Sequence, residues 1–344
     1  MAQGKPATDW KETVAPDEAA RFEAYAQELA AMQRQNVRNG VTFRALHAKP
    51  HQGFQATFTV LPDVPEYARV GLFATPATYP AYVRYSNGAG RFQADRRPDV
   101  RGIGLKLVGV KGRKLIPGME DAPTQDFLLI TSAATPVKNV DEFLGLVRVV
   151  GSPLKGLARL IGDIGFVRLL QIARSAAKSL RIPTISLATR DFHSALPSQF
   201  GPYAVHFRLK ARAAGEPGAA PGERRNYLGE ELAARLQRAP ISYDFQAQFF
   251  VDDARTPIED ASIEWRESDA PFVTLARLDI AQQDAISPRG RKLNEFIERL
   301  AFDPWHSQAE FKPLGNMMRA RNVAYRLSTM ARKAAPEPDG SEKF

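Results

Sequence analysis

The stretch FQATFTV, residues 54–60, alternates apolar and polar side chains with a period of two. Phe54, Phe58 and Val60 fall on one side of an extended chain, and the intervening Gln and Thr residues fall on the other. This alternation is typical of a strand with one face in a core and the other toward solvent. The sequence therefore predicts that a β-sheet begins here.

The same alternation returns in the second half of the chain, in AVHFRLKAR (204–212) and SYDFQAQFFVD (242–252). His206 lies on the polar side of the first of these strands, so we expect it to face solvent. Further segments with strand character are AYVRYSNG (81–88), RGIGLKLV (101–108), QDFLLI (125–130) and PFVTLARLDI (271–280). Many strands with one apolar face predict an antiparallel barrel or sandwich.

Helical segments flank this β region. Asp17 can cap a helix that runs to about Arg38, after a loose arm over residues 1–15. The composition of 211–226 predicts a flexible surface loop, and we expect a disordered tail after Lys333. The predicted organisation is an N-terminal arm and helix (1–40), a β-barrel with inserted helices (41–290) and C-terminal helices (291–344).

The inserted segment, residues 141–181, is basic and amphipathic. After Glu142, Asp163 is the only acidic residue among its lysines and arginines. One interpretation is helices packed on the barrel with a solvated basic side, and the other is a segment that rests on a membrane surface. The residues expected to break any single long helix here are Pro153, Gly156, Gly162 and Gly165.

Composition excludes several kinds of chemistry. The chain has no cysteine, which rules out disulfides, thiolate metal sites and iron–sulfur clusters. The net charge of +9 is spread along the chain without a Lys/Arg block, so we expect no nucleic-acid partner. The five histidines lack the spacing of a zinc site. The sequence shows neither an apolar run of membrane-spanning length nor a secretion signal, and we expect a cytoplasmic protein.

Residues 319–332, RARNVAYRLSTMAR, carry one candidate for chemistry. On a helix, Arg321 and Tyr325 share a face, and Arg332 follows about two turns later. A phenol has an unperturbed pKa near 10, so its ionisation at pH 7 costs roughly 4 kcal/mol. A ferric ion and a close guanidinium can together supply that energy. Taken alone, an arginine and a tyrosine at this spacing most often belong to surface packing.

A second candidate lies in TFRALHAK, residues 42–49, just before the first strand. His47 could act as a general base there, although a lone histidine is usually structural. In VRYSNGAG, residues 83–90, Arg84 and Ser86 point to the same side of a strand. Ordinary polar contacts would explain both residues equally well.

Together and in this order, these segments resemble the haem catalase superfamily over roughly residues 40–332. The segments that carry the resemblance are RALHAK (44–49), VRYSNGAG (83–90) followed by RPDVRGIGLK (97–106), IEWRESDAPFVTLARL (263–278), FDP (302–304) and the RxxxY pattern of 321–325. The resemblance implies an α+β fold, in which an antiparallel β-barrel forms the core and helices pack around it. It also implies haem b as the cofactor.

The resemblance assigns roles to individual residues. It makes Tyr325 the iron ligand on one side of the haem and His47 the acid–base group on the other. Arg321 would stabilise the phenolate, and Ser86 would orient the imidazole. The residues expected to pair with the haem propionates are Arg44, Arg84 and Arg332.

The sequence also departs from the family pattern. Thr131 stands where catalases carry a distal asparagine, with Ser132 as the alternative, and the C-terminal helical domain of long catalases is missing. The resemblance is therefore to the short catalase-related peroxidases, which reduce hydrogen peroxide or organic hydroperoxides with an organic electron donor. We expect weak catalase activity at most, and a homo-oligomer.

Three other functions stay open at this point. An allene-oxide-synthase-like isomerase of fatty-acid hydroperoxides would share the fold and need no reductant. A non-catalytic haem-binding protein would explain the loss of the distal asparagine, but it would have no need for His47. A lipid-carrying barrel without haem is the third alternative.

Overall fold

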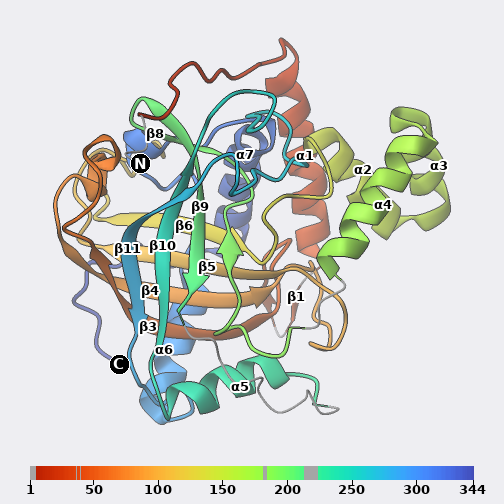
Figure 1. Cartoon of the computed structure of the whole chain (residues 1–344). Coiled ribbons are helices and arrows are strands. Elements are labelled where there is room, and N and C mark those ends of the chain that lie inside the picture. Colours follow the sequence, from red (N-terminus) through yellow and green to blue (C-terminus); the bar gives the residue numbers. More distant parts are fainter. Residues whose placement is uncertain (1–4, 36, 39, 181–183, 213–223) are drawn as a thin grey trace.

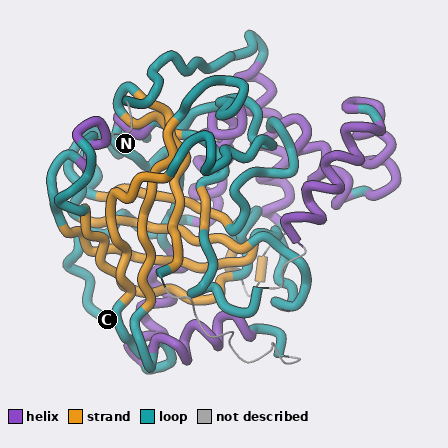
Figure 2. The backbone as a smooth tube through the Cα atoms, in the orientation of Figure 1, coloured by secondary structure: helices purple, strands orange, loops and turns teal. Residues whose placement is uncertain are grey.

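The computed structural model describes residues 5–344 except 36, 39, 181–183 and 213–223. Its centre is an antiparallel β-barrel (Figures 1 and 2). Its eight strands are, in order around the barrel, β10 (Ile241–Phe249), β11 (Phe272–Ile280), β3 (Pro50–Val60), β4 (Thr78–Asn87), β5 (Arg101–Val108), β6 (Thr124–Ile130), β7 (Phe192–His193) and β9 (Tyr203–Ala211). Strand β10 pairs with both β11 and β9, and this double pairing closes the barrel. The predicted barrel is confirmed and the sandwich alternative is wrong.

Aromatic side chains fill the interior of the barrel. Phe54 and Phe58 of β3 are fully buried, as their alternation with polar residues predicts. Phe58 lies 5.2 Å from Phe245 of β10 in an edge-to-face contact, and Phe127 of β6 lies 4.9 Å from the same ring. Burying a phenylalanine contributes about 1.5–3 kcal/mol, so this cluster holds strands that are distant in sequence together.

A layer of helices covers one end of the barrel. Helices α1 (Glu18–Arg34) and α7 (Asn316–Arg332) lie side by side (Figure 1), and α2 (Val140–Gly151) packs against both. Their shared apolar cluster contains Phe22, Val140, Leu144 and Ala320. Two more helices, α5 (Tyr227–Leu236) and α6 (Pro288–Arg299), pack on β3. Within the described ranges, no helix has the length and apolar character needed to cross a bilayer.

The inserted segment forms three helices, and its breaks fall at two of the predicted positions. Helix α3 (Pro153–Ile164) begins at the proline, and α4 (Phe166–Leu180) follows Gly165, whose φ is +78°. Helix α2 belongs to the helical layer, but α3 and α4 project away from the body of the molecule (Figure 1). The interpretation that the whole insertion packs on the barrel is therefore wrong for these two helices.

The first helix ends earlier than the sequence suggested. Helix α1 stops at Arg34, and a small hairpin of β1 (Val37–Arg38) and β2 (Val41–Thr42) follows it. Gly40, between the two strands, has a φ of +76°, a backbone conformation that favours glycine. The dipeptide Asn39–Gly40 is the usual sequence signal for a tight hairpin turn.

Both ends of the chain are anchored, contrary to the expected loose arm and disordered tail. In the N-terminal arm, Glu12 binds Arg319 of α7 at 2.6 Å. In the C-terminal tail, Glu337 binds the fully buried Lys106 of β5 at 2.5 Å. Lys106 also binds the buried Asp126 at 2.7 Å, so Glu337 is the second carboxylate on this buried ammonium group, and the contact holds the tail on the barrel. Arg181 and most of the loop expected at 211–226 lie outside the described residues.

His206 corrects a further expectation, because it does not face solvent. It is 6% exposed, and its ring stacks on Trp265 at 4.0 Å. The next residue on that face of β9, Arg208, lies over the ring of Phe272 at 3.5 Å. The outer face of β9 is therefore covered by the chain near β11, so polar residues on it are buried.

One further strand and three 3-10 turns complete the description of the fold. Strand β8 (Ser198–Phe200) pairs with β9 outside the closed ring, and short 3-10 turns connect other parts of the barrel. These turns are η1 (Glu66–Ala68), η2 (Gly71–Phe73) and η3 (Ala309–Phe311).

Candidate functional site

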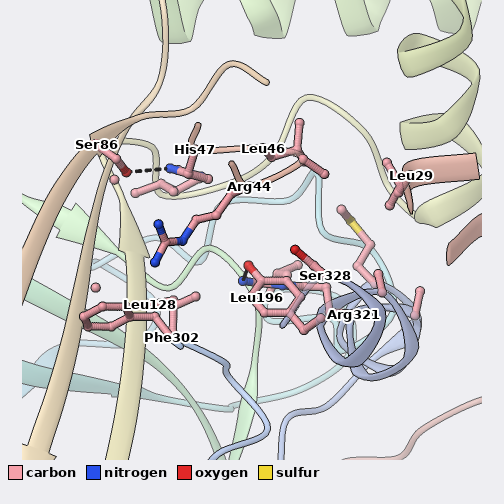
Figure 3. A pocket seen from close by; sticks show the side chains of 18 of the residues that line it. Leu29, Arg44, Leu46, His47, Ser86, Leu128, Leu196, Phe302, Arg321 and Ser328 are labelled. Carbon is pink, nitrogen blue, oxygen red and sulfur yellow. Dashed lines mark hydrogen bonds between the residues drawn. The ribbon is translucent and has the colours of Figure 1, made fainter. Parts of the chain in front are cut away.

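A cavity lies between the barrel and the helical layer (Figure 3). It leaves about 290 Å³ for the centres of water molecules, and most of its lining is apolar. The barrel side comprises strands β4, β5 and β6 with the segment that precedes β3, and the helical side comprises α1, α2 and α7. The sequence-predicted residues that line it together are Arg44, His47, Arg84, Ser86, Arg321, Tyr325 and Arg332.

The backbone of His47 has an unusual conformation. Its φ is +53°, in the left-handed region that residues other than glycine rarely adopt. The His47 N–H donates to the carbonyl of Gly88 at 3.0 Å, and Arg84 Nη2 donates to the His47 carbonyl at 3.0 Å. Such a conformation persists only where the surroundings enforce it, and it is common at functional sites.

The His47 side chain is held from two directions. Its Nδ1 lies 3.0 Å from Ser86 Oγ, the contact drawn as a dashed line in Figure 3. On one side, a Cβ atom added to Gly102 would lie 2.5 Å from the imidazole Cε1, so only glycine leaves room for the ring. Because Nδ1 is used by Ser86, Nε2 is the ring nitrogen available to a ligand in the cavity.

The electrostatic surroundings keep this imidazole neutral. Burial, followed by the charges of Arg84 and Arg321, lowers the pKa of His47 to about 3. Above pH 5 the ring therefore carries no charge and can accept a proton, which a general base requires.

Arg321 and Tyr325 occupy the opposite side of the cavity, one turn apart on α7. Arg321 Nη2 donates to Tyr325 Oη at 2.7 Å, and the guanidinium also lies 4.9 Å from the centre of the phenol ring. The positive charge beside this oxygen stabilises a phenolate, which is a ligand for ferric iron. Among the described residues no cluster of three or more His, Cys, Asp or Glu could hold a metal ion.

A third group of residues gathers around Glu298 of α6. The Glu298 carboxylate accepts hydrogen bonds from Arg84 Nε at 2.6 Å and from Arg44 Nη1, and its carbonyl accepts one from Arg332 Nη2 at 2.9 Å. Burial alone would raise the pKa of Glu298, but the charges of Arg44 and Arg84 outweigh it and lower the pKa. Sequence reasoning missed Glu298, since it is one of two glutamates in LNEFIERL (293–300) and has no signal of its own.

The lining of the cavity carries four arginines, two of which, Arg44 and Arg84, are paired with Glu298. Arg44, Arg84, Arg321 and Arg332 line it, and none of its described lining residues is acidic. Burial, the main cause, lowers the pKa of Arg332 to about 10, and that side chain remains a cation at neutral pH. Such a lining suits a ligand that carries carboxylates at one end and an apolar body at the other.

Thr131 is the one predicted site residue that the structure does not bring to the cavity. It follows β6, and its hydroxyl accepts a hydrogen bond from the backbone N–H of Arg101 at 3.1 Å. The cavity wall is formed instead by the preceding residues, Leu128 to Ile130. The alternative, Ser132, donates to the carbonyl of Ala134 at 2.7 Å and does not line the cavity either.

No protein-family model matches the chain. A catalase-related peroxidase of Mycolicibacterium paratuberculosis is 29% identical over 303 residues, which are 84% of this chain and 88% of that protein.

Solved structures of catalases share the fold. A bacterial catalase has a TM-score of 0.64 at 20% identity, a fungal catalase 0.64 at 13%, and catalase A of Saccharomyces cerevisiae 0.65 at 14%. The matches cover 96%, 96% and 90% of this chain, but only 63%, 66% and 64% of those proteins. The α+β fold with a β-barrel core, expected from the resemblance, is confirmed.

Proposed function

Since this chain is a short member of the catalase superfamily, we propose that it is a haem peroxidase, which reduces peroxides with electrons from an organic donor. The observation that carries the proposal is the pair of walls around one cavity. A phenol bonded to a guanidinium at 2.7 Å occupies one wall, and a neutral imidazole bonded to Ser86 at 3.0 Å occupies the other.

The residues of the cavity fit haem b. Tyr325 would be the iron ligand. Arg44, Arg84 and Arg332 would pair with the two propionates, and to do so they would share or exchange their present bonds to Glu298. The apolar lining, which includes Leu128 of the barrel, would contact the macrocycle. When bound, haem supplies the iron that binds the peroxide and the electrons that cleave its O–O bond.

His47 carries the proton through this reaction. With Nδ1 bonded to Ser86, the neutral ring uses Nε2 to take the proton from the peroxide and to return it to the departing oxygen. Arg84 assists from a distance, because its bond to the His47 carbonyl holds the backbone that aims the ring.

Thr131 supports peroxidase rather than fast catalase activity. A distal asparagine would hold a second hydrogen-bond donor over the bound peroxide, whereas Thr131 is bonded to the backbone of Arg101 outside the cavity. Nε2 of His47 would then contact the peroxide without an asparagine amide beside it. We propose that dismutation is slow and that the electrons come from an organic donor.

A titration with hemin tests the proposal. The full chain is expected to bind one hemin with an absorption spectrum of ferric phenolate type, and to oxidise a phenolic donor in the presence of hydrogen peroxide. Tyr325→Phe should lose that spectrum, whereas Tyr79→Phe, on the barrel, should keep it. A protein that stays colourless with hemin, or an unchanged spectrum in Tyr325→Phe, contradicts the proposal.

The apolar wall of helices favours a second candidate function, isomerisation of fatty-acid hydroperoxides. Leu29 of α1 and Phe143 of α2 belong to this wall and could contact an acyl chain. An isomerase consumes no reductant. Turnover of a fatty-acid hydroperoxide without a donor would therefore favour this candidate, and dependence on the donor would favour the peroxidase. A protein that binds haem without turnover of either kind would be a carrier.

A further inference from the structure

The hairpin of α3 and α4 exposes large apolar side chains at a distance from the cavity. On α3 these are Leu154, Leu157 and Ile161, exposed by 87%, 39% and 36%, and on α4 they are Phe166, Val167 and Leu170, exposed by 67%, 71% and 42%. In Figure 1 the hairpin stands out from the body of the molecule. Apolar patches of this kind on a soluble protein mark interaction sites.

The exposed residues form a stripe along each helix. In α3, Leu154, Leu157 and Ile161 repeat at helical spacing on one face, whereas the buried Gly156 and Leu160 belong to another face. The same separation holds in α4, where Ile172 is buried at 2% and the exposed apolar residues lie on a different face. Each helix thus packs with one side and leaves a second apolar side uncovered.

Exposed cations accompany both stripes. Arg174 and Lys178 lie at the edge of the stripe of α4, and Lys155 and Arg159 lie on a neighbouring face of α3. The hairpin contains one acidic residue, Asp163, at 3.8 Å from Arg159. An exposed apolar stripe together with a basic face is the arrangement of a helix that lies in a membrane interface.

We propose that the α3–α4 hairpin docks on an anionic phospholipid surface. The apolar stripes enter the boundary between headgroups and acyl chains, and the lysines and arginines contact lipid phosphates. Charge complementarity selects this occupant over a second copy of the chain, because a copy docked on the same face would bring a second set of cations against the first.

The packing of α3 joins this surface to the cavity. A Cβ atom added to Gly145 of α2 would lie 2.5 Å from Leu160, and one added to Gly156 would lie 2.6 Å from the carbonyl of Arg148. The backbones of the two helices therefore approach closely at Gly156, and the side chain of Leu160 packs on Gly145. Helix α2 also lines the cavity through Val140 and Phe143. The hairpin is thus connected through α2 to one wall of the candidate site.

Vesicle flotation with the full chain tests the proposal. We expect at least tenfold tighter binding to vesicles of equal parts phosphatidylglycerol and phosphatidylcholine than to phosphatidylcholine alone. Binding should weaken as salt is raised, because salt screens the charges of exposed side chains. Equal binding to both vesicle types, or to neither, overturns the proposal.

Matched variants locate the contact. The hairpin variants are Leu154→Ser/Phe166→Ser/Val167→Ser and Lys155→Glu/Arg174→Glu/Lys178→Glu, and their controls, at exposed positions elsewhere, are Ile263→Ser/Ile286→Ser and Lys210→Glu/Arg289→Glu/Lys292→Glu. Each hairpin variant should lose vesicle binding by tenfold or more with an unchanged melting temperature, and each control should keep it. Binding that survives in the hairpin variants overturns the proposal. So does a wild-type dimer that the serine variant dissociates, which would make this face a contact between copies.

Discussion

His47 and Tyr325 border one cavity, but the two walls hold them in different ways. The barrel fixes His47 through its backbone, with bonds to Gly88 and Arg84, and through its ring, with a bond to Ser86. Helix α7 places Tyr325 by helical spacing and joins it to Arg321, one turn away.

The two walls therefore depend on different properties, the barrel wall on geometry and the helical wall on charge. On the barrel wall, neighbouring strands and a positive φ aim a neutral base, so a change in shape should do the most harm. On the helical wall, a cation sits beside an oxygen atom, so a change in charge should do the most harm. Variants on the two walls should therefore differ in which property they lose, catalysis or the electronic state of bound haem.

The largest effect is expected for His47. We expect His47→Ala to keep haem and to lower the rate of reaction with hydrogen peroxide by about 10²–10⁴-fold, the usual contribution of an acid–base group. His47→Gln separates proton transfer from hydrogen bonding, since glutamine donates and accepts hydrogen bonds but is not a base. Stopped-flow absorption measures the rate, and near-wild-type reactivity of the glutamine variant would contradict the role of the imidazole.

A smaller loss of the rate with peroxide, about 10- to 100-fold, is expected for Gly102→Ala on strand β5 of the barrel wall. The added Cβ would lie 2.5 Å from His47 Cε1, so the ring must leave its position beside Ser86. Gly53→Ala is the matched control, because Gly53 lies on barrel strand β3 and not in the lining of the cavity, and its Cβ would meet Ile297 at 2.9 Å. Both variants should have similarly lowered melting temperatures, and the rate with peroxide should fall only in Gly102→Ala. An equal loss of rate in both would mean that general packing, not the aim of His47, is at stake.

The two walls also show which features could be predicted from the sequence and which could not. The alternation in 54–60 and the other strands predicted the barrel, because a period of two has one structural meaning. The predicted residues of the cavity depended on the resemblance, since RxxxY and a lone His47 are common patterns with ordinary explanations. Bringing them together takes strand pairings that no local pattern contains.

The residues that the sequence did not predict correctly share this cause, namely contacts between segments that are distant in sequence. Glu298 and Gly102 act through residues that are distant in sequence, so neither has a local signature. Thr131 was placed by order along the chain, but it lies just beyond the cavity wall formed by β6. The tail was expected to be disordered because nothing in its sequence shows that Lys106 is buried and binds Glu337.

On the helical wall, Arg321→Leu should lower peroxidase activity by about tenfold, since a hydrogen bond to a charged group contributes about 1.5–3 kcal/mol. It should also move the charge-transfer bands of bound haem, a change that loss of packing alone would not cause. Arg326→Leu, on the same helix beside Tyr325 but exposed, is the control and should leave the bands in place. Unchanged bands in Arg321→Leu would contradict the stabilisation of a phenolate by this cation.

The smallest effect is expected from pH, and it tests the neutral state of the barrel wall. Burial and the charges of Arg84 and Arg321 lower the pKa of His47 to about 3, so the base is unprotonated at both pH 8 and pH 5. The rate with peroxide should then change less than about twofold over this range, whereas a histidine with the ordinary pKa of about 6.5 would be roughly 97% protonated at pH 5.

Folding stability should depend on pH in a different way. The unfolded chain binds a proton at His47 near pH 6.5 and the folded chain does not, so stability falls as pH drops from about 6.5 toward 3. Rates should therefore be measured well below the melting temperature at each pH, and a tenfold fall between pH 8 and pH 5 with the fold intact would show that His47 is charged in the working enzyme.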